Sequence, residues 1–111
     1  MLPNELNIRV QEVTLQRRQL SIEGALTLEN TRIFAEAMRM ERAPTTVLDL
    51  SGVPHMDSAG MGALIHFYVS CHKNGRKLIL MGVNPRVDEL LELTKVKALL
   101  VVIPRGVETS S

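Results

Sequence analysis

Residues 48–62 read LDLSGVPHMDSAGMG, and this stretch decides the fold. It begins as a short apolar strand, passes through a turn, and opens a long amphipathic helix with the pair Asp57-Ser58. A strand that leads through a turn into a helix is typical of an α/β domain. The same arrangement places the Ser58 hydroxyl at the positive end of a helix dipole, where added negative charge is tolerated.

The rest of the chain continues this alternation. Apolar runs and apolar/polar alternation predict strands over 6–11, 20–23, 45–50, 77–81 and 98–103, with 16–19 as the turn between the first two. Helical spacing of apolar residues predicts helices over 28–42, over 59–73 and from Pro85 onward. We therefore expect an N-terminal hairpin followed by β-α-β crossovers, which give one α/β domain with a mixed sheet of about five strands and three helices.

Local signals define the ends and the buried faces of these helices. Thr27 and Asn84 are the expected N-caps, and Pro44 and Asn74-Gly75 are the expected stops. The positions expected to face the core are Ile33, Phe34, Ala37 and Met38 in the first helix, Met61, Leu64, Ile65, Tyr68 and Val69 in the second, and Val87, Leu90 and Leu91 in the third.

Composition restricts the class of protein. The chain has 111 residues, 45% of them apolar, and a mean hydropathy of +0.08, as expected of one folded domain over 1–111 with a frayed tail over 106–111. A net charge of +1 and an aromatic content of 3% argue against a nucleic-acid-binding surface. The single cysteine, Cys71, fits a reducing compartment, and no apolar run reaches the roughly 20 residues that span a bilayer. We therefore expect a soluble cytoplasmic protein that does not act at a membrane.

Enzyme and metal motifs are incomplete in this sequence. A nucleophile elbow around Ser58 needs glycine where Met56 stands, and Gly60-x-Gly62 lacks the third glycine of a dinucleotide-binding turn. No Gly-Lys-Ser/Thr sequence is present for a phosphate loop, and the three histidines with Cys71 match no zinc spacing. We therefore predict a protein that is not an enzyme and that holds no cofactor or metal.

Three stretches match a known pattern: IEGAL at 22–26, VLDLSGV at 47–53 leading into DSAGMG at 57–62, and LIL at 78–80 followed by NPRV at 84–87. On these stretches the chain resembles the STAS domain family, specifically the bacterial anti-sigma factor antagonists. The middle stretch is the most specific, because it combines an Asp-Ser pair, a small residue, Gly, an aliphatic residue and Gly directly after such a strand. The resemblance covers nearly the whole chain and implies a single STAS-type domain.

The resemblance also implies a partner switch. In this family the unphosphorylated antagonist binds an anti-sigma factor that is also a serine kinase, and the sigma factor is released. The kinase binds ATP and phosphorylates the serine of the Asp-Ser pair, here Ser58, so that binding is lost, and a PP2C-type phosphatase resets the switch. The partner-binding residues expected here are Thr27, Met56, Asp57, Ser58, Ala59, Gly60, Met61 and Gly62. A homodimer is compatible with the same pattern.

The residues around Ser58 suit such a switch. A phosphate adds about −1.5 to −2 charges, and the backbone N–H groups of residues 59–61 are expected to be free to receive it. Gly60 and Gly62 each cost about 1 kcal/mol of helix propensity relative to alanine. A bare first turn that lets a partner's backbone approach closely gives a reason for that cost. Met56 and Met61 flank Ser58, either as exposed contacts or as core fillers.

Other interpretations stay open for the same residues. Serine is a preferred N-cap, so Ser58 also has a structural interpretation, and Asp57 is either a turn residue or a partner contact. Many family members carry an acidic residue where Thr27 stands, and residues 104–111 are too short and too broken for the family's usual final helix. The alternative function is a STAS docking subunit of a stress-signalling complex or of a lipid or anion transport assembly, in which the helix end need not be phosphorylated.

Overall fold

The structure is a computed structural model that describes residues 5–104, with the backbone alone described at 11–13. Its elements are β1 (Asn7–Val13), β2 (Arg17–Glu23), α1 (Thr31–Arg39), β3 (Thr45–Gly52), α2 (Ser58–Lys73), β4 (Lys77–Met81), α3 (Pro85–Leu93), the 3₁₀ turn η1 (Lys97–Leu99) and β5 (Val101–Ile103). The tail expected over 106–111 lies outside the described residues.

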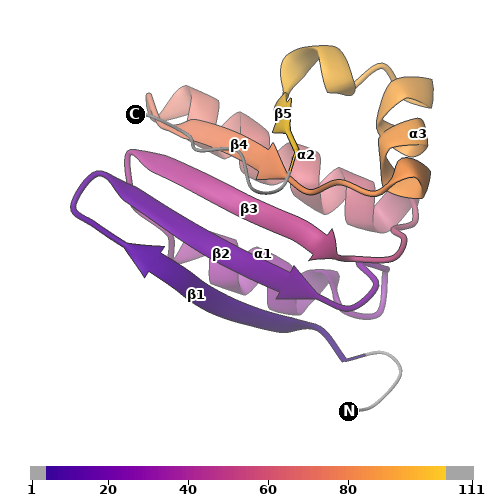
Figure 1. Ribbon diagram of the computed structural model, residues 1–111, viewed down its shortest axis with the longest axis horizontal. Helices are drawn as coiled ribbons and strands as arrows, with labels where there is room; N and C mark the ends of the chain where they lie inside the picture. The colour runs from indigo at the N-terminus through magenta and orange to yellow at the C-terminus, as the bar shows by residue number, and fades with distance from the viewer. Residues whose placement is uncertain (1–4, 105–111) are drawn as a thin grey trace.

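The strands form one sheet in the order β1-β2-β3-β4-β5 (Figure 1). β1 and β2 pair antiparallel as the expected hairpin, whereas every later neighbour pair is parallel. A parallel neighbour requires a crossover connection, which α1, α2 and the α3–η1 segment supply in turn. The predicted α/β fold, with a five-stranded mixed sheet and three helices, is confirmed.

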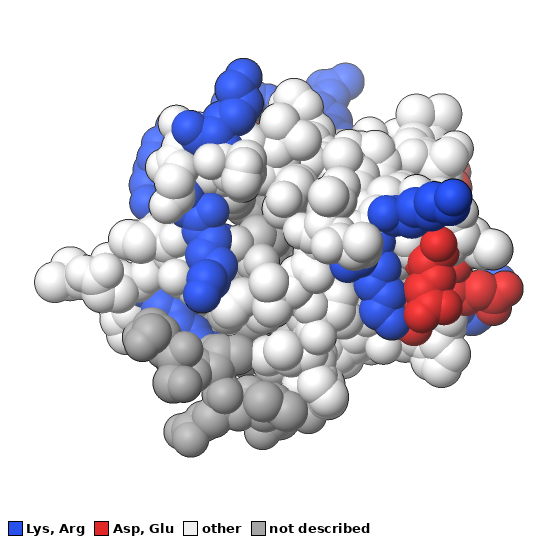
Figure 2. All heavy atoms as spheres, turned by 90° about the horizontal axis from the view of Figure 1, so that it is seen from above, with Lys and Arg blue, Asp and Glu red and all other residues white. Residues whose placement is uncertain are grey.

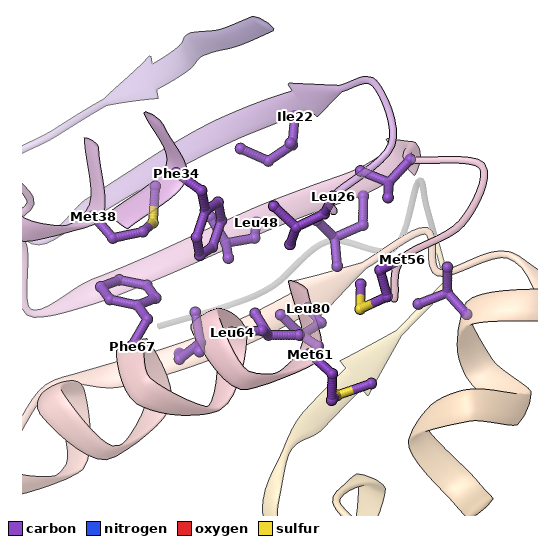
Figure 3. Close-up of a cluster of buried hydrophobic side chains, with 14 of the residues drawn as sticks. Ile22, Leu26, Phe34, Met38, Leu48, Met56, Met61, Leu64, Phe67 and Leu80 are labelled. Carbon is purple, nitrogen blue, oxygen red and sulfur yellow. The ribbon is translucent and has the colours of Figure 1, made fainter. Parts of the chain in front are cut away.

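The core lies between the sheet and the helices α1 and α2, which both lie behind the sheet in Figure 1. A row of cross-strand partners on β2 to β5 forms one side of it: Leu20, Leu48, Leu80 and Val102. Phe34 of α1 and Phe67 of α2 point into the same cluster from the helical side (Figure 3). This packing fixes the orientation of α2 and therefore the position of its N-terminus.

The start of α1 differs from the prediction. The helix begins at Thr31, and Asn30 rather than Thr27 occupies the N-cap position. The Asn30 side chain holds the preceding loop instead, since its Oδ1 accepts from the Thr27 N–H at 2.9 Å and its Nδ2 donates to the Ala25 carbonyl at 2.6 Å. Asn30 is 2% exposed, so this buried amide keeps residues 27–30 in a turn and delays the helix.

Three other element boundaries also differ from the prediction. α1 ends at Arg39 instead of residue 42, because Glu41 turns inward and places its carboxylate 3.5 Å from Arg18 Nε. Residues 17–19, expected as a turn, belong to β2. The final strand is Val101–Ile103, and the three residues before Leu100 form η1.

η1 replaces the first part of the predicted strand because Lys97 is held against α3. Its ammonium lies 2.8 Å from Asp88 Oδ1 and 3.1 Å from Glu92 Oε1. The two carboxylates raise the pKa of Lys97, chiefly through the hydrogen bond to Asp88. The chain can extend into a strand only after this turn.

Of the twelve predicted core positions, six are buried, four are half-buried against the core, and two are exposed. Ile33 is 49% exposed and Val69 is 44% exposed, so both predictions were wrong. On α2 the buried face is instead completed by Phe67 and Cys71. The predicted caps at the other ends are confirmed: Asn84 caps α3 through the Val87 N–H at 2.9 Å, and α2 ends at Lys73 with Asn74 as C-cap.

Candidate functional site

The N-terminus of α2 lies beside the loop that leads into α1. The Leu26 N–H donates to the His55 carbonyl at 3.1 Å, and the Asp57 N–H donates to the Leu26 carbonyl at 3.2 Å. Leu26 and Met56 form an isolated parallel bridge. The loops that follow two neighbouring parallel strands are thus joined, at the edge of the sheet where α/β proteins place their functional residues.

Asp57 caps α2 and holds the neighbouring loop with the same carboxylate. Its Oδ1 accepts from the Gly60 N–H at 2.8 Å, and its Oδ2 accepts from the Leu28 N–H at 3.1 Å. These N–H groups, first that of Gly60 and then that of Leu28, hold the pKa of Asp57 below its ordinary value of 3.8. The carboxylate therefore stays ionised at neutral pH, and Asp57 has a structural role that neither sequence interpretation contained.

Ser58 is the first residue of α2 and is exposed, so it is not the N-cap. The expectation of free N–H groups at 59–61 was wrong at two positions. The Gly60 N–H donates to the Asp57 side chain, and the Met61 N–H donates to the Asp57 carbonyl at 2.9 Å. The cap carboxylate thus already occupies the helix end that would otherwise receive an anion. A phosphate on Ser58 would stand next to that negative charge.

The two glycines of the first turn have different roles. A Cβ on Gly60 would lie 2.0 Å from the Leu26 carbonyl oxygen, so glycine is needed there for contact within the fold. Gly62 is exposed, and a Cβ there would meet nothing within 4 Å. The prediction that both glycines serve a partner's approach was therefore wrong for Gly60.

The methionines next to Ser58 are core residues. Met56 is 7% exposed and Met61 is 5% exposed, and both point into the apolar cluster of Figure 3. The interpretation as exposed contacts was wrong, because the bridge between residues 26 and 56 and the first turn of α2 direct these side chains inward.

The surface at this end of the domain is made by Asp57, Ser58 and Gly62, with the half-buried Ala59 and Thr27 at its margin. Sequence reasoning missed Leu28, which is 72% exposed and whose N–H binds Asp57. Leu28 belongs to the helix predicted over 28–42, so no sequence signal indicated that its N–H binds the Asp57 carboxylate.

The Asp57 carboxylate makes a pH-dependent contribution to stability. Because its pKa is lowered on folding, the contribution is fully present above pH 3.8 and is lost as the pH falls through the folded-state pKa. We expect Asp57→Asn, which keeps one acceptor oxygen but removes the charge, to lower the free energy of unfolding at pH 7. Urea titrations of both proteins should show this difference shrinking below pH 3.8. An equal difference at pH 7 and at acid pH would contradict the charge-based role.

The described residues contain neither a cluster of metal-binding side chains nor a helix that could span a membrane. Within residues 5–104, no three His, Cys, Asp or Glu side chains come together to hold a metal ion. Cys71 is buried at the end of α2, as predicted, and burial raises the pKa of its thiol. Over the same part of the chain, every helix is too short or too polar to cross a membrane.

The chain is similar to known proteins in both sequence and fold. A curated anti-sigma-B factor antagonist of Staphylococcus epidermidis is 31% identical over 99 residues, which cover 86% of this chain and 92% of that protein. The crystal structure of an anti-sigma factor antagonist from Mycobacterium paratuberculosis superposes with a TM-score of 0.81 at 18% identity, over 95% of this chain and 91% of the other. At that identity the superposition shows the shared fold.

A transport-related protein has a similar structure. A sulfate transporter family protein from Wolinella succinogenes superposes with a TM-score of 0.73 at 28% identity, over 84% of this chain and 80% of the other. The sequence model of the STAS domain family matches residues 6–109, which is nearly the whole sequence. This chain therefore belongs to the STAS domain family.

Proposed function

We propose that this chain is an anti-sigma factor antagonist that acts as a phosphorylation-controlled binding module. In its unphosphorylated form it binds an anti-sigma factor that is also a serine kinase, and phosphorylation of Ser58 ends that binding. The observation that carries the proposal is the exposed Ser58 at the first position of α2, directly after the capping Asp57 and beside the bare Gly62. The anti-sigma-B factor antagonist relative supports the same role.

The position of Ser58 gives a phosphate a large effect on a partner and a small effect on the fold. The side chain is exposed, so phosphorylation displaces no core residue. The phosphate adds about −1.5 to −2 charges next to the ionised Asp57. Covering both anions with a partner surface is unfavourable unless the partner supplies cations. Reversing a 99:1 equilibrium takes about 5.5 kcal/mol, and desolvation of a phosphate contributes a large part of it.

The rest of the proposed cycle assigns the chemistry to the partners. The anti-sigma factor binds ATP and transfers its phosphoryl group, and a PP2C-type phosphatase removes it. This chain supplies the acceptor hydroxyl and the docking surface, with no catalytic residue, cofactor or metal of its own. The cycle runs in the cytoplasm without nucleic acid or membrane contacts of this chain, and it is compatible with a homodimer.

Phosphorylation by a cognate partner tests the proposal directly. Incubation with the purified anti-sigma factor and ATP is expected to add about 80 Da to one serine, as measured by intact-mass and peptide-level mass spectrometry. Ser58→Ala should abolish the added mass, and Ser51→Ala, at another exposed serine, should retain it. An unmodified chain, or a modification that persists in Ser58→Ala, would sink the phosphorylation step.

The second candidate function is a docking subunit of a transport assembly. The 28% identity to the sulfate transporter family protein of Wolinella succinogenes favours it. In that case the same helix end binds its partner in a stable complex that phosphorylation does not control. Partner binding that stays unchanged after treatment with kinase and ATP, and that is insensitive to charge at Ser58, would support this second function over the switch.

A further inference from the structure

A groove between α1 and α2 extends along the helical face of the domain. Two adjoining hollows of about 400 and 440 Å³ share Met38, Arg39 and Ser70 and so form one continuous depression. It runs from Ala59, in the first turn of α2, to Asn74 at the C-cap of that helix. A 16-residue helix is about 24 Å long, so the groove is long enough for a peptide segment.

The groove is positively charged and its cations are not neutralised by carboxylates. Arg32, Arg39, Arg42 and Arg76 line it, and neither hollow is lined by Asp or Glu. Within residues 5–104, none of these four arginines forms an ion pair with a carboxylate. Arg42 and Arg76 donate instead to the neutral backbone carbonyl of Glu41, at 3.0 and 2.7 Å. All four guanidinium charges therefore remain available to an anion.

The distribution of charge over the molecule is uneven. On the face seen in Figure 2, the end of the molecule where β4 begins carries Lys and Arg side chains without Asp or Glu, whereas at the end that carries α3 Asp and Glu stand beside further Lys and Arg side chains. With a net charge of only +1, the groove is a local feature and not a reflection of a basic chain. An end of the molecule that carries one sign of charge favours one orientation of a charged partner.

The floor of the groove is small and apolar. Ala35, Ala59 and Ala63 leave room between the two helices, and Met38 and Phe67 close the bottom. Arginine at the rim above an apolar floor is complementary to a segment that carries acidic side chains on one face and apolar side chains on the other. Both hollows are partly open to solvent, so that a peptide segment can enter the groove from the side.

We propose that the α1/α2 groove binds an acidic, amphipathic segment of a protein partner. The inference deepens the proposed function and rests on it for the identity of the natural partner. Because Ala59 lines the groove and Ser58 precedes it, a phosphate on Ser58 would add negative charge at one end of the bound segment. The phosphate then repels the acidic segment, so phosphorylation weakens partner binding in the groove as well as at the surface around Ser58.

A peptide titration tests the groove without any kinase. The ¹⁵N-labelled full chain is titrated with an acetylated peptide of repeated Glu-Leu-Glu-Ala units, and with a matched peptide of Lys-Leu-Lys-Ala units. The acidic peptide is expected to shift the amide signals of Ala35, Ala63 and Ser70 and to leave that of Glu89 in α3 unchanged. The Lys peptide should shift none of them. Added salt should weaken the binding, because the arginines at the rim are exposed to solvent or nearly so.

Matched charge variants separate the groove from net charge. Arg32→Gln/Arg39→Gln is expected to raise the Kd for the acidic peptide about tenfold or more, whereas Arg9→Gln/Arg86→Gln removes the same charge elsewhere and should change it less than about twofold. Equal weakening by both pairs, shifts confined to other elements, or displacement of the peptide by an equal concentration of ATP would overturn the proposal. Failure of Ser58 phosphorylation leaves this assay unaffected, so the two proposals fail separately.

Discussion

Gly60→Ala is expected to destabilise the domain by about 2–3 kcal/mol, whereas Gly62→Ala should stabilise it by about 0.5–1 kcal/mol. The new Cβ at Gly60 would lie 2.0 Å from the Leu26 carbonyl oxygen and 2.8 Å from the Leu26 carbonyl carbon. Both are backbone atoms of a residue whose side chain is fully buried, so the loop before α1 has to move. At Gly62 the Cβ meets open space, and the gain in helix propensity remains.

Thermal and urea unfolding of the three proteins, followed by circular dichroism, measure this difference. For a domain of this size, each 1 kcal/mol shifts Tm by about 4–8 °C, so the two variants should move in opposite directions from the parent. Each is the control for the other, because the chemical change and the helix are the same. A common sign for both shifts would show that the close approach of Gly60 to Leu26 does not govern stability. Gly62→Ala, being stable, can then be used to ask whether the partner contacts that turn.

Ser58→Asp is expected to weaken binding of the anti-sigma factor by at least about tenfold, or 1.4 kcal/mol, while moving Tm by less than about 4 °C. The new carboxylate would stand beside the ionised Asp57. The N–H groups of Gly60 and Leu28 already donate to Asp57 and are not available to the added charge. A partner that covers this surface would therefore have to desolvate two neighbouring anions. The fold should be nearly indifferent, since exposed substitutions away from special features stay within about 0.5 kcal/mol.

Ser58→Asn is the matched control, because it has almost the shape of aspartate without the charge. Isothermal titration calorimetry with the anti-sigma factor should show near-parental affinity for Ser58→Asn and weak binding for Ser58→Asp. Equal losses in both variants would attribute the effect to shape and leave no role for charge. Phosphorylated protein should bind more weakly than Ser58→Asp, because a phosphate carries more charge than a carboxylate.

The sequence predicted the fold well because the apolar patterns were long and local. Both ends of β4 were predicted as the structure has them. The start of α2 was predicted to within one residue, and its end was predicted correctly because Asn74 and Gly75 mark it. The start of α1 was missed because Thr27 and Asn30 are both good cap residues. Only the contact of Asn30 with the Ala25 carbonyl, which depends on the folded loop, decides between them.

That residues 57–62 form the functional site stays a prediction, but several structural details of this stretch differ from what the sequence predicted. Residues 57–62 were identified from their pattern, yet the pattern does not say that Asp57 binds the Leu28 N–H across a gap of 29 residues. The sequence did contain a signal that distinguishes the buried glycine from the exposed one. Gly60 lies on the helix face of Leu64, whereas Gly62 lies on that of the exposed His66, as a period of 3.6 residues requires. Periodicity therefore predicts which glycine packs and which stays open.

The double hydrogen bonding of Asp57 has a kinetic consequence. Hydrogen bonds join the loop after β2 to the start of α2 in the free protein, so the proposed docking surface is already in place before a partner binds. Little conformational entropy remains to be lost on association, and encounter need not wait for a loop to fold. Association rates should then vary little among surface variants, and differences in affinity should lie in how long the complex lasts. By holding the loop after β2 against the start of α2, the Asp57 carboxylate is expected to lower the entropy cost of binding at the proposed docking surface.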